Sequence, residues 1–118
     1  MPGSDGQPEP TELEEARQIL ATRWGVQAQG GVGEPSDYDL LLEVLTDRVG
    51  NLLAHRHQKL MASLYILDIS EQRYNDAMNA PTHLKRAERL ARAILERETE
   101  KIASRRKYAA RPQGELGS

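Results

Sequence analysis

The chain has 118 residues, a net charge of −2, one tryptophan, no phenylalanine and no cysteine. That length supports one modest hydrophobic core, and the lack of cysteine excludes disulfides, thiolate metal ligands and a cysteine nucleophile. No apolar run approaches the roughly 20 residues of a membrane span, and the N-terminus lacks the basic and apolar regions of a secretory signal. We therefore expect a cytoplasmic protein without membrane association, and the many leucines and alanines predict an all-α fold.

The N-terminal part of the chain predicts a helix that is tethered to the rest. Residues 1–10 are rich in proline, glycine and acids, which predicts disorder. Thr11 and Glu14 form a T-x-x-E capping box, and apolar residues at helical spacing predict an amphipathic N-terminal helix within 11–24. Residues 25–36 contain four glycines and one proline, which predicts a flexible linker. This helix is therefore expected to dock loosely on the rest of the chain, or not at all.

Residues 37–107 predict a small helical bundle of about four helices. In a helix over 38–54, apolar side chains cover about half of the circumference, which implies contact with more than one neighbour. In the next helix, over 58–67, apolar residues occur nearly all round, and such a helix is usually buried. We therefore expect residues 58–67 to lie at the centre of the bundle.

Two further helices complete the predicted bundle. Asp68 with Glu71 gives a D-x-x-E capping pattern, and Ser70 is a second candidate cap for a short helix over 69–78. Pro81 ends that helix, because proline lacks an amide donor and disfavours helix in the preceding residue. The last helix is expected over 82–107, followed by a disordered tail over 108–118.

The last helix carries charged residues inside its apolar stripe. Glu98 and Arg105 are seven residues apart and fall on the same face as the aliphatic residues. Because burial of an unpaired charge is costly, either the helix projects beyond the core or these charges pair across an interface, with Arg48 as a candidate partner of Glu98. The candidate interface residues for a homodimer or another protein partner are Ala87, Ala91, Glu98 and Ile102.

Positive charge is concentrated at the C-terminal end. Residues 81–111 carry ten bases and four acids, whereas residues 1–36 carry six acids and two bases. Such asymmetry indicates a binding tail or charge matching between subunits. The uninterrupted basic side chains are candidates for contact with nucleic acid or with an acidic partner; they are Arg105, Arg106, Lys107 and Arg111.

Neither a metal site nor a catalytic site is predicted. His55 and His57 are two residues apart, about 200° on a helix, so they cannot bind one ion from the same face. In a turn they could do so only with further ligands such as His83, and nothing in the sequence places those nearby. The chain also lacks the nucleophile-elbow, phosphate-loop, dinucleotide-binding and zinc-protease motifs. We expect no enzyme activity and no cofactor.

Two segments carry a resemblance to known proteins. LYILDIS (64–70) and LARAILERETEKIASRRKY (90–108) resemble segments of a family of small, uncharacterised bacterial all-helical proteins. The resemblance implies a helical domain and implies no activity, cofactor or site residue. The function expected from the sequence is therefore a non-enzymatic protein–protein interaction or regulatory module, with nucleic-acid association through the basic C-terminal helix as the alternative.

Overall fold

The structure is a computed structural model that describes residues 10–26 and 36–109. These residues form five helices and contain no strand, which confirms the all-α prediction. The bounds are α1 Pro10–Arg23, α2 Ser36–His55, α3 His57–Leu67, α4 Glu71–Met78 and α5 His83–Ala109. Within this part of the chain, no helix is both long and apolar enough to cross a membrane. The described residues leave out 1–9, most of the predicted linker and 110–118, which include Arg111. Most of the predicted disorder at the two ends falls on these residues.

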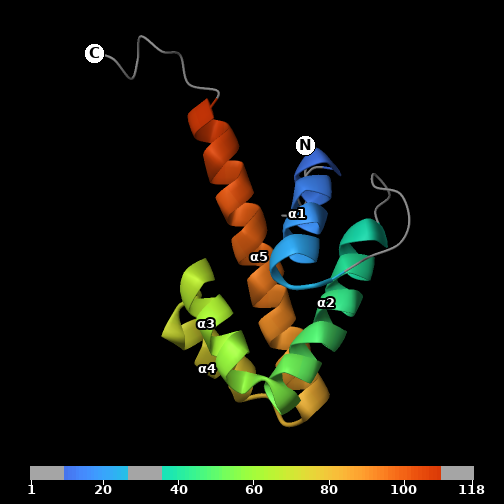
Figure 1. Ribbon diagram of the computed structural model, residues 1–118, viewed down its shortest axis with the longest axis vertical. Coiled ribbons are helices and arrows are strands. Elements are labelled where there is room, and N and C mark those ends of the chain that lie inside the picture. The colour runs from blue at the N-terminus through green and yellow to red at the C-terminus, as the bar shows by residue number, and fades with distance from the viewer. Residues whose placement is uncertain (1–9, 27–35, 110–118) are drawn as a thin grey trace.

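α5 is the helix around which the others pack. It contacts each of the other four helices, and Figure 1 shows α1 and α2 on one side of it and α3 and α4 on the other. Its aliphatic stripe is buried, as the helical spacing predicts, and Ala87 lies against Gly50 of α2. Small side chains at such a contact let two helices approach closely. Leu84, at the start of the stripe, is the exception, because it is 65% exposed.

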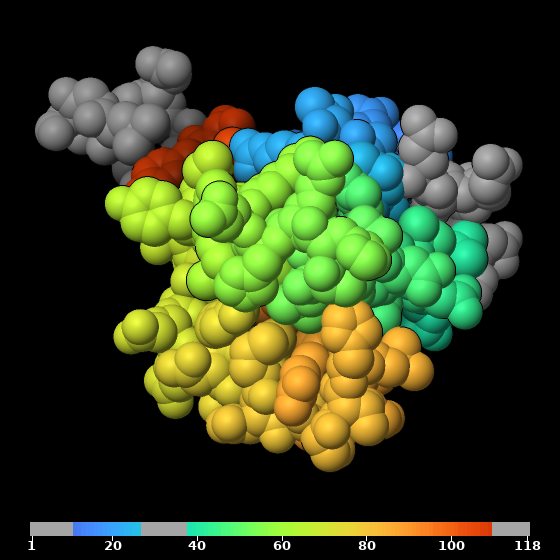
Figure 2. Space-filling model, turned by 60° about the horizontal axis from the view of Figure 1, so that its bottom comes forward, coloured from blue at the N-terminus to red at the C-terminus, as the bar shows by residue number. Residues whose placement is uncertain are grey.

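α3 is not at the centre of the bundle, so that prediction is wrong. Only Leu60, Leu64 and Leu67 of this helix are buried, and they form one stripe that packs on α2 and α5. Tyr65 and Ile66 are 86% and 69% exposed on the other side. The helix has only 11 residues and neighbours on one side, so its apolar residues outnumber the positions that the core can cover. Figure 2 shows α3 at the centre of one face of the molecule, with α2, α4 and the start of α5 around it.

α1 is docked firmly, in contrast to the loose tether that the linker predicts. Leu13, Ala16, Leu20 and Trp24 all belong to the buried core. Gly25 follows at φ +69°, a left-handed conformation that glycine adopts without steric cost, and the N–H of Val26 then bonds to the carbonyl of Leu20. Val26 is itself buried, so the first two residues of the predicted linker belong to the packed structure.

The helix ends explain the chain's course between α3 and α4. Asp68 ends α3 in a left-handed conformation, with φ 66° and ψ 45°. Of the two candidate caps, Ser70 is the one that caps α4, because its side chain accepts a hydrogen bond from the N–H of Arg73. The predicted capping box at Thr11 is not formed, since α1 already begins at Pro10.

Candidate functional site

The basic end of α5 binds the acidic helix α1 of the same chain. The Arg106 guanidinium lies 3.0 Å from one carboxylate oxygen of Glu15, and Arg105 lies 3.3 Å from the other. Arg106 also donates to the hydroxyl of Thr11 at 2.8 Å. One acid of the N-terminal part and two bases of the C-terminal end are therefore paired within one chain. Lys107 is exposed on the last turn of α5.

These contacts change the acidity of Glu15. The hydrogen bond from Arg106 is the main reason that the pKa of Glu15 lies below its ordinary value, and the hydrogen bond from Arg105 acts in the same direction. Both bonds favour the ionised carboxylate. The α1–α5 contact is therefore suited to neutral pH.

The four residues named as a candidate interface lie inside the chain. Ala87, Ala91, Glu98 and Ile102 are all buried among the chain's own helices. Glu98 is 1% exposed and accepts a hydrogen bond from the indole N–H of Trp24 at 3.2 Å. Its other carboxylate oxygen lies 3.6 Å from the Arg23 guanidinium. The charge in the apolar stripe therefore has partners without a second subunit.

Arg48, the candidate partner of Glu98, has a different role. Its Nε donates to the backbone carbonyl of Trp24 at 2.9 Å. A Cβ added at Gly25 would lie 3.6 Å from this guanidinium, at ordinary van der Waals distance. Arg48 therefore fixes the end of α1 on α2, and α1 itself supplies the partners of Glu98.

The three histidines have separate surroundings. His57 lies 3.4 Å from the Tyr74 hydroxyl, and His83 lies 3.1 Å from the backbone carbonyl of Gly50. His55 is exposed at the end of α2. Among the residues that the structure describes, no three histidine or carboxylate side chains form a group that could hold a metal ion.

A shallow hollow lies between α2 and α5 and has a volume of about 420 Å³. Asp39, Glu43 and Asp47 line it at a spacing of four residues along α2, and Glu88 and Arg92 face them from α5. Glu88 and Arg92 form an ion pair at 3.9 Å. The arrangement resembles a solvated charged groove more than a site in which one group would act as acid or base.

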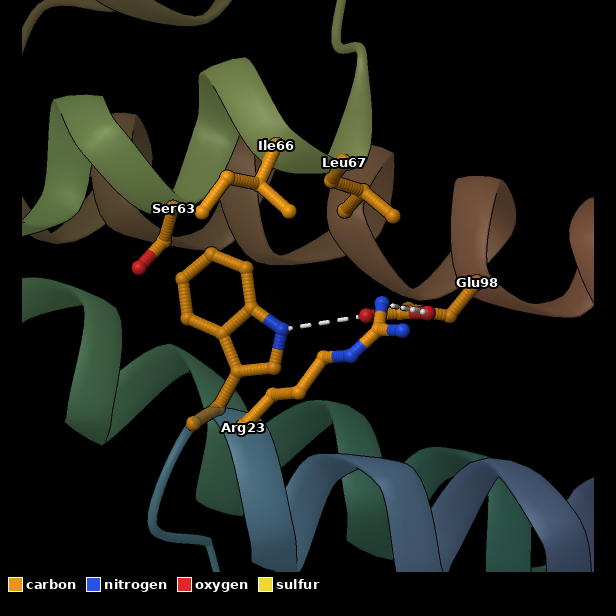
Figure 3. A pocket seen from close by; sticks show the side chains of 6 residues that line it. Arg23, Ser63, Ile66, Leu67 and Glu98 are labelled. Atoms are coloured by element: carbon orange, nitrogen blue, oxygen red, sulfur yellow. Dashed lines mark hydrogen bonds and ion pairs between the residues drawn. The ribbon is translucent and has the colours of Figure 1, made fainter.

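A smaller cavity, of about 220 Å³, lies between α1, α3 and α5. α1 and α3 both pack on α5 without packing against each other, and the cavity occupies the gap between them. Figure 3 shows the Arg23 chain on one side, Ser63, Ile66 and Leu67 of α3 on the other, and Glu98 at the end. Trp24 also lines the cavity. The lining is therefore mainly apolar, with an ion pair between the buried Glu98 and the half-exposed Arg23.

The exposed side of α3 borders this cavity. We call Met61, Ala62, Tyr65 and Ile66 the α3 face; all four are exposed, and Ile66 also lines the cavity. Most surface helices present charged and polar residues on the side away from the core, whereas this one presents a tyrosine, an isoleucine and a methionine. Sequence reasoning missed this surface, although its signal was present, because apolar residues all round a short helix fit an exposed contact face as well as a buried one.

Comparisons with protein-family models, with curated proteins and with solved structures found no match to this chain.

Proposed function

We propose that this chain is a non-enzymatic protein–protein interaction module and that the α3 face is its contact surface. The observation that carries the proposal is the exposure of Tyr65 and Ile66, at 86% and 69%, on one side of a helix whose other side is core. Contiguous apolar surface with polar surroundings is typical of protein contact sites. Tyrosine is also among the residues most often found at the energetic centre of an interface.

The neighbouring cavity supports the same proposal. At about 220 Å³ it is smaller than the 300–1,000 Å³ typical of small-molecule sites. A single large side chain of a partner suits that volume better than a cofactor does. Interfaces commonly derive most of their affinity from one or two side chains that fill such a pocket, with a surrounding ring of contacts that excludes water.

The alternative function, nucleic-acid association, is less well supported. Of the four basic residues named for it, Arg105 and Arg106 bind Glu15 within the chain. Phosphate contacts by these two side chains would compete with that carboxylate. Among the three of these residues that the structure describes, only Lys107 lies outside that contact, and a cation by itself gives only weak, salt-sensitive binding.

Photo-crosslinking tests the proposed function. A photoreactive amino acid is placed at position 66 in one variant and at position 84 in another, and both are irradiated in the native host cells. Ile66 and Leu84 are matched controls because they are apolar and similarly exposed, at 69% and 65%. We expect protein adducts from position 66 and few from position 84. Equal yields from both positions, or none from position 66, would contradict the proposed function.

A further inference from the structure

The charges at the two ends of α3 oppose the dipole of that helix. Its first turn contains Lys59 and no acid, Arg56 precedes it, and its C-terminal end is followed by Asp68 with no base in the last turn. Anions are favourable at a helix N-terminus and cations at a C-terminus. The positive charge at the N-terminal end of α3 therefore suits the C-terminal end of another helix. The negative charge at the C-terminal end of α3 suits the N-terminal end of another helix.

Asp68 also adopts a conformation that favours a different residue. Its φ is 66°, and helices that end in this left-handed conformation usually have glycine there. The Asp68 side chain is 83% exposed, and its ion pair with Arg97, at 3.5 Å, is long. The Asp68 carboxylate is therefore largely in solvent and accessible to a second cation from another molecule.

Ala62 lies at the middle of this surface. It is the sixth of the 11 residues of α3, and at about 100° per residue it points away from the buried stripe of Leu60, Leu64 and Leu67. Its small side chain allows another helix to approach closely at this point. Arg56 and Asp68 are each six residues from Ala62, on opposite sides of it along the chain.

We infer that the α3 face binds a second copy of this chain, with the two α3 helices antiparallel and Ala62 of both copies at the two-fold axis. The inference rests on the proposed function and specifies its partner. A two-fold interface brings the same surface of both copies together, so the surface must be complementary to itself. In this arrangement the end of α3 that carries Asp68 lies beside the end that carries Arg56 in the second copy. Arg56 then meets the C-terminal end of the second α3 and Asp68 meets its N-terminal end, and the helix dipole favours both charges there.

The apolar residues fit the same arrangement. Tyr65 and Lys59 are each three residues from Ala62, so Tyr65 of one copy and Lys59 of the other lie at the same level of the pair, on either side of the line of contact, within reach of the long lysine side chain. A lysine ammonium over a tyrosine ring is a favourable cation–π contact. Because α3 is only about 16 Å long, the interface is smaller than that of a permanent dimer. We therefore expect association in the micromolar range.

Sedimentation velocity of the full chain tests this inference. From about 1 µM to about 500 µM, the chain should change from monomer to dimer. Arg56→Asp alone and Asp68→Asn alone should each weaken association about tenfold, because symmetry removes two charge pairs at once. The exchange Arg56→Asp with Asp68→Arg should associate more tightly than Arg56→Asp alone, because it restores the charge pairs between the copies, but less tightly than the native chain, because arginine is strained in the left-handed conformation and the charges no longer suit the helix dipoles. Circular dichroism checks that each variant is folded, and asparagine is chosen because it tolerates the left-handed conformation.

A disulfide tests the register, since the chain has no native cysteine. Two cysteines at a two-fold axis come within the 4.4–6.8 Å Cα separation that a disulfide requires. Ala62→Cys should therefore oxidise rapidly to a covalent dimer, and Leu84→Cys should not. A chain that stays monomeric at about 500 µM, or a dimer unaffected by these charges and not trapped at position 62, overturns the inference. Adducts from position 66 to a different protein would then leave the proposed function standing.

Discussion

At the scale of single residues, Glu98 connects α5 with the end of α1. Its carboxylate lies inside the core, where an unpaired charge would be costly, and it binds the Trp24 indole and the Arg23 guanidinium. Both partners come from the end of α1 and the residue that follows it. Glu98 therefore makes the docking of α1 specific, because an apolar residue at position 98 could not accept a hydrogen bond from the indole N–H of Trp24.

Replacement of Glu98 should lower stability. Glu98→Ala leaves the Trp24 N–H without its acceptor in a largely buried place, which costs roughly 1–3 kcal/mol, so we expect the free energy of unfolding in urea to fall by about 2 kcal/mol. Glu100→Ala, in which an exposed carboxylate with surface ion pairs is lost, should change it by less than about 1 kcal/mol. Similar losses in both variants would show that Glu98 has no special role.

The two described glycines in packed surroundings should respond oppositely to alanine. Gly25 has φ +69°, a conformation that costs other residues about 1–2 kcal/mol, so Gly25→Ala should destabilise by about that amount. Gly50 is helical, and an added Cβ would meet His83 and Ala87 at 3.5 and 3.6 Å, which is ordinary contact. Gly50→Ala should stabilise by about 0.5–1 kcal/mol. Urea unfolding of both variants measures the difference, and a loss at Gly50 would mean that its neighbours cannot accept the methyl group.

At the scale of helices, the contact between α1 and α5 combines a buried apolar part with an ionic end. Leu13, Ala16 and Leu20 supply the apolar part, and Glu15 binds both Arg105 and Arg106 at the edge. The apolar part gives most of the affinity, because exposed ion pairs contribute little. The ionic end makes that contact dependent on pH.

The docking of α1 should weaken in acid. The pKa of Glu15 is lowered in the folded chain, so its ion pairs stabilise the fold above the ordinary glutamate pKa of about 4.3, and this contribution is lost as the pH falls through the lowered value. Trp24, the only tryptophan, is buried and reports the change through its fluorescence. Glu15→Gln should remove part of the pH dependence, whereas Glu14→Gln should not alter the α1–α5 contact, because Glu14 binds Arg17 within α1. The same change in Trp24 fluorescence with pH in the native chain and in both variants would contradict this account.

Helix positions could be predicted from the sequence because their signals are local. Ser70 and Pro81 lie beside the breaks between α3, α4 and α5, and each acts on its own backbone. The place of each helix in the bundle depends on the lengths and contacts of its neighbours. For that reason local signals could not show that α1 is core, and the apolar residues all round α3 fitted a buried helix as well as a half-exposed one.

At the scale of the whole molecule, the five described helices complete one core and leave one apolar surface uncovered. α5 contacts all four other helices, and Glu15 of α1 pairs with Arg105 and Arg106 of α5 within the chain. The α3 face is the feature that this packing does not use. The candidate site could not be predicted, because an apolar residue on a short helix looks the same in a sequence whether it meets the core or a partner.

The most direct test of this account is the free energy of unfolding of the variant Tyr65→Ser with Ile66→Ser, measured in urea at about 1 µM. Serine has a helix propensity close to those of tyrosine and isoleucine, so the change removes little except apolar surface. If the α3 face serves a partner and not the fold, the double variant should lose less than about 1 kcal/mol, whereas Leu64→Ala should lose about 2–5 kcal/mol. A loss in the double variant as large as that of Leu64→Ala would show that Tyr65 and Ile66 belong to the core, and would contradict the account.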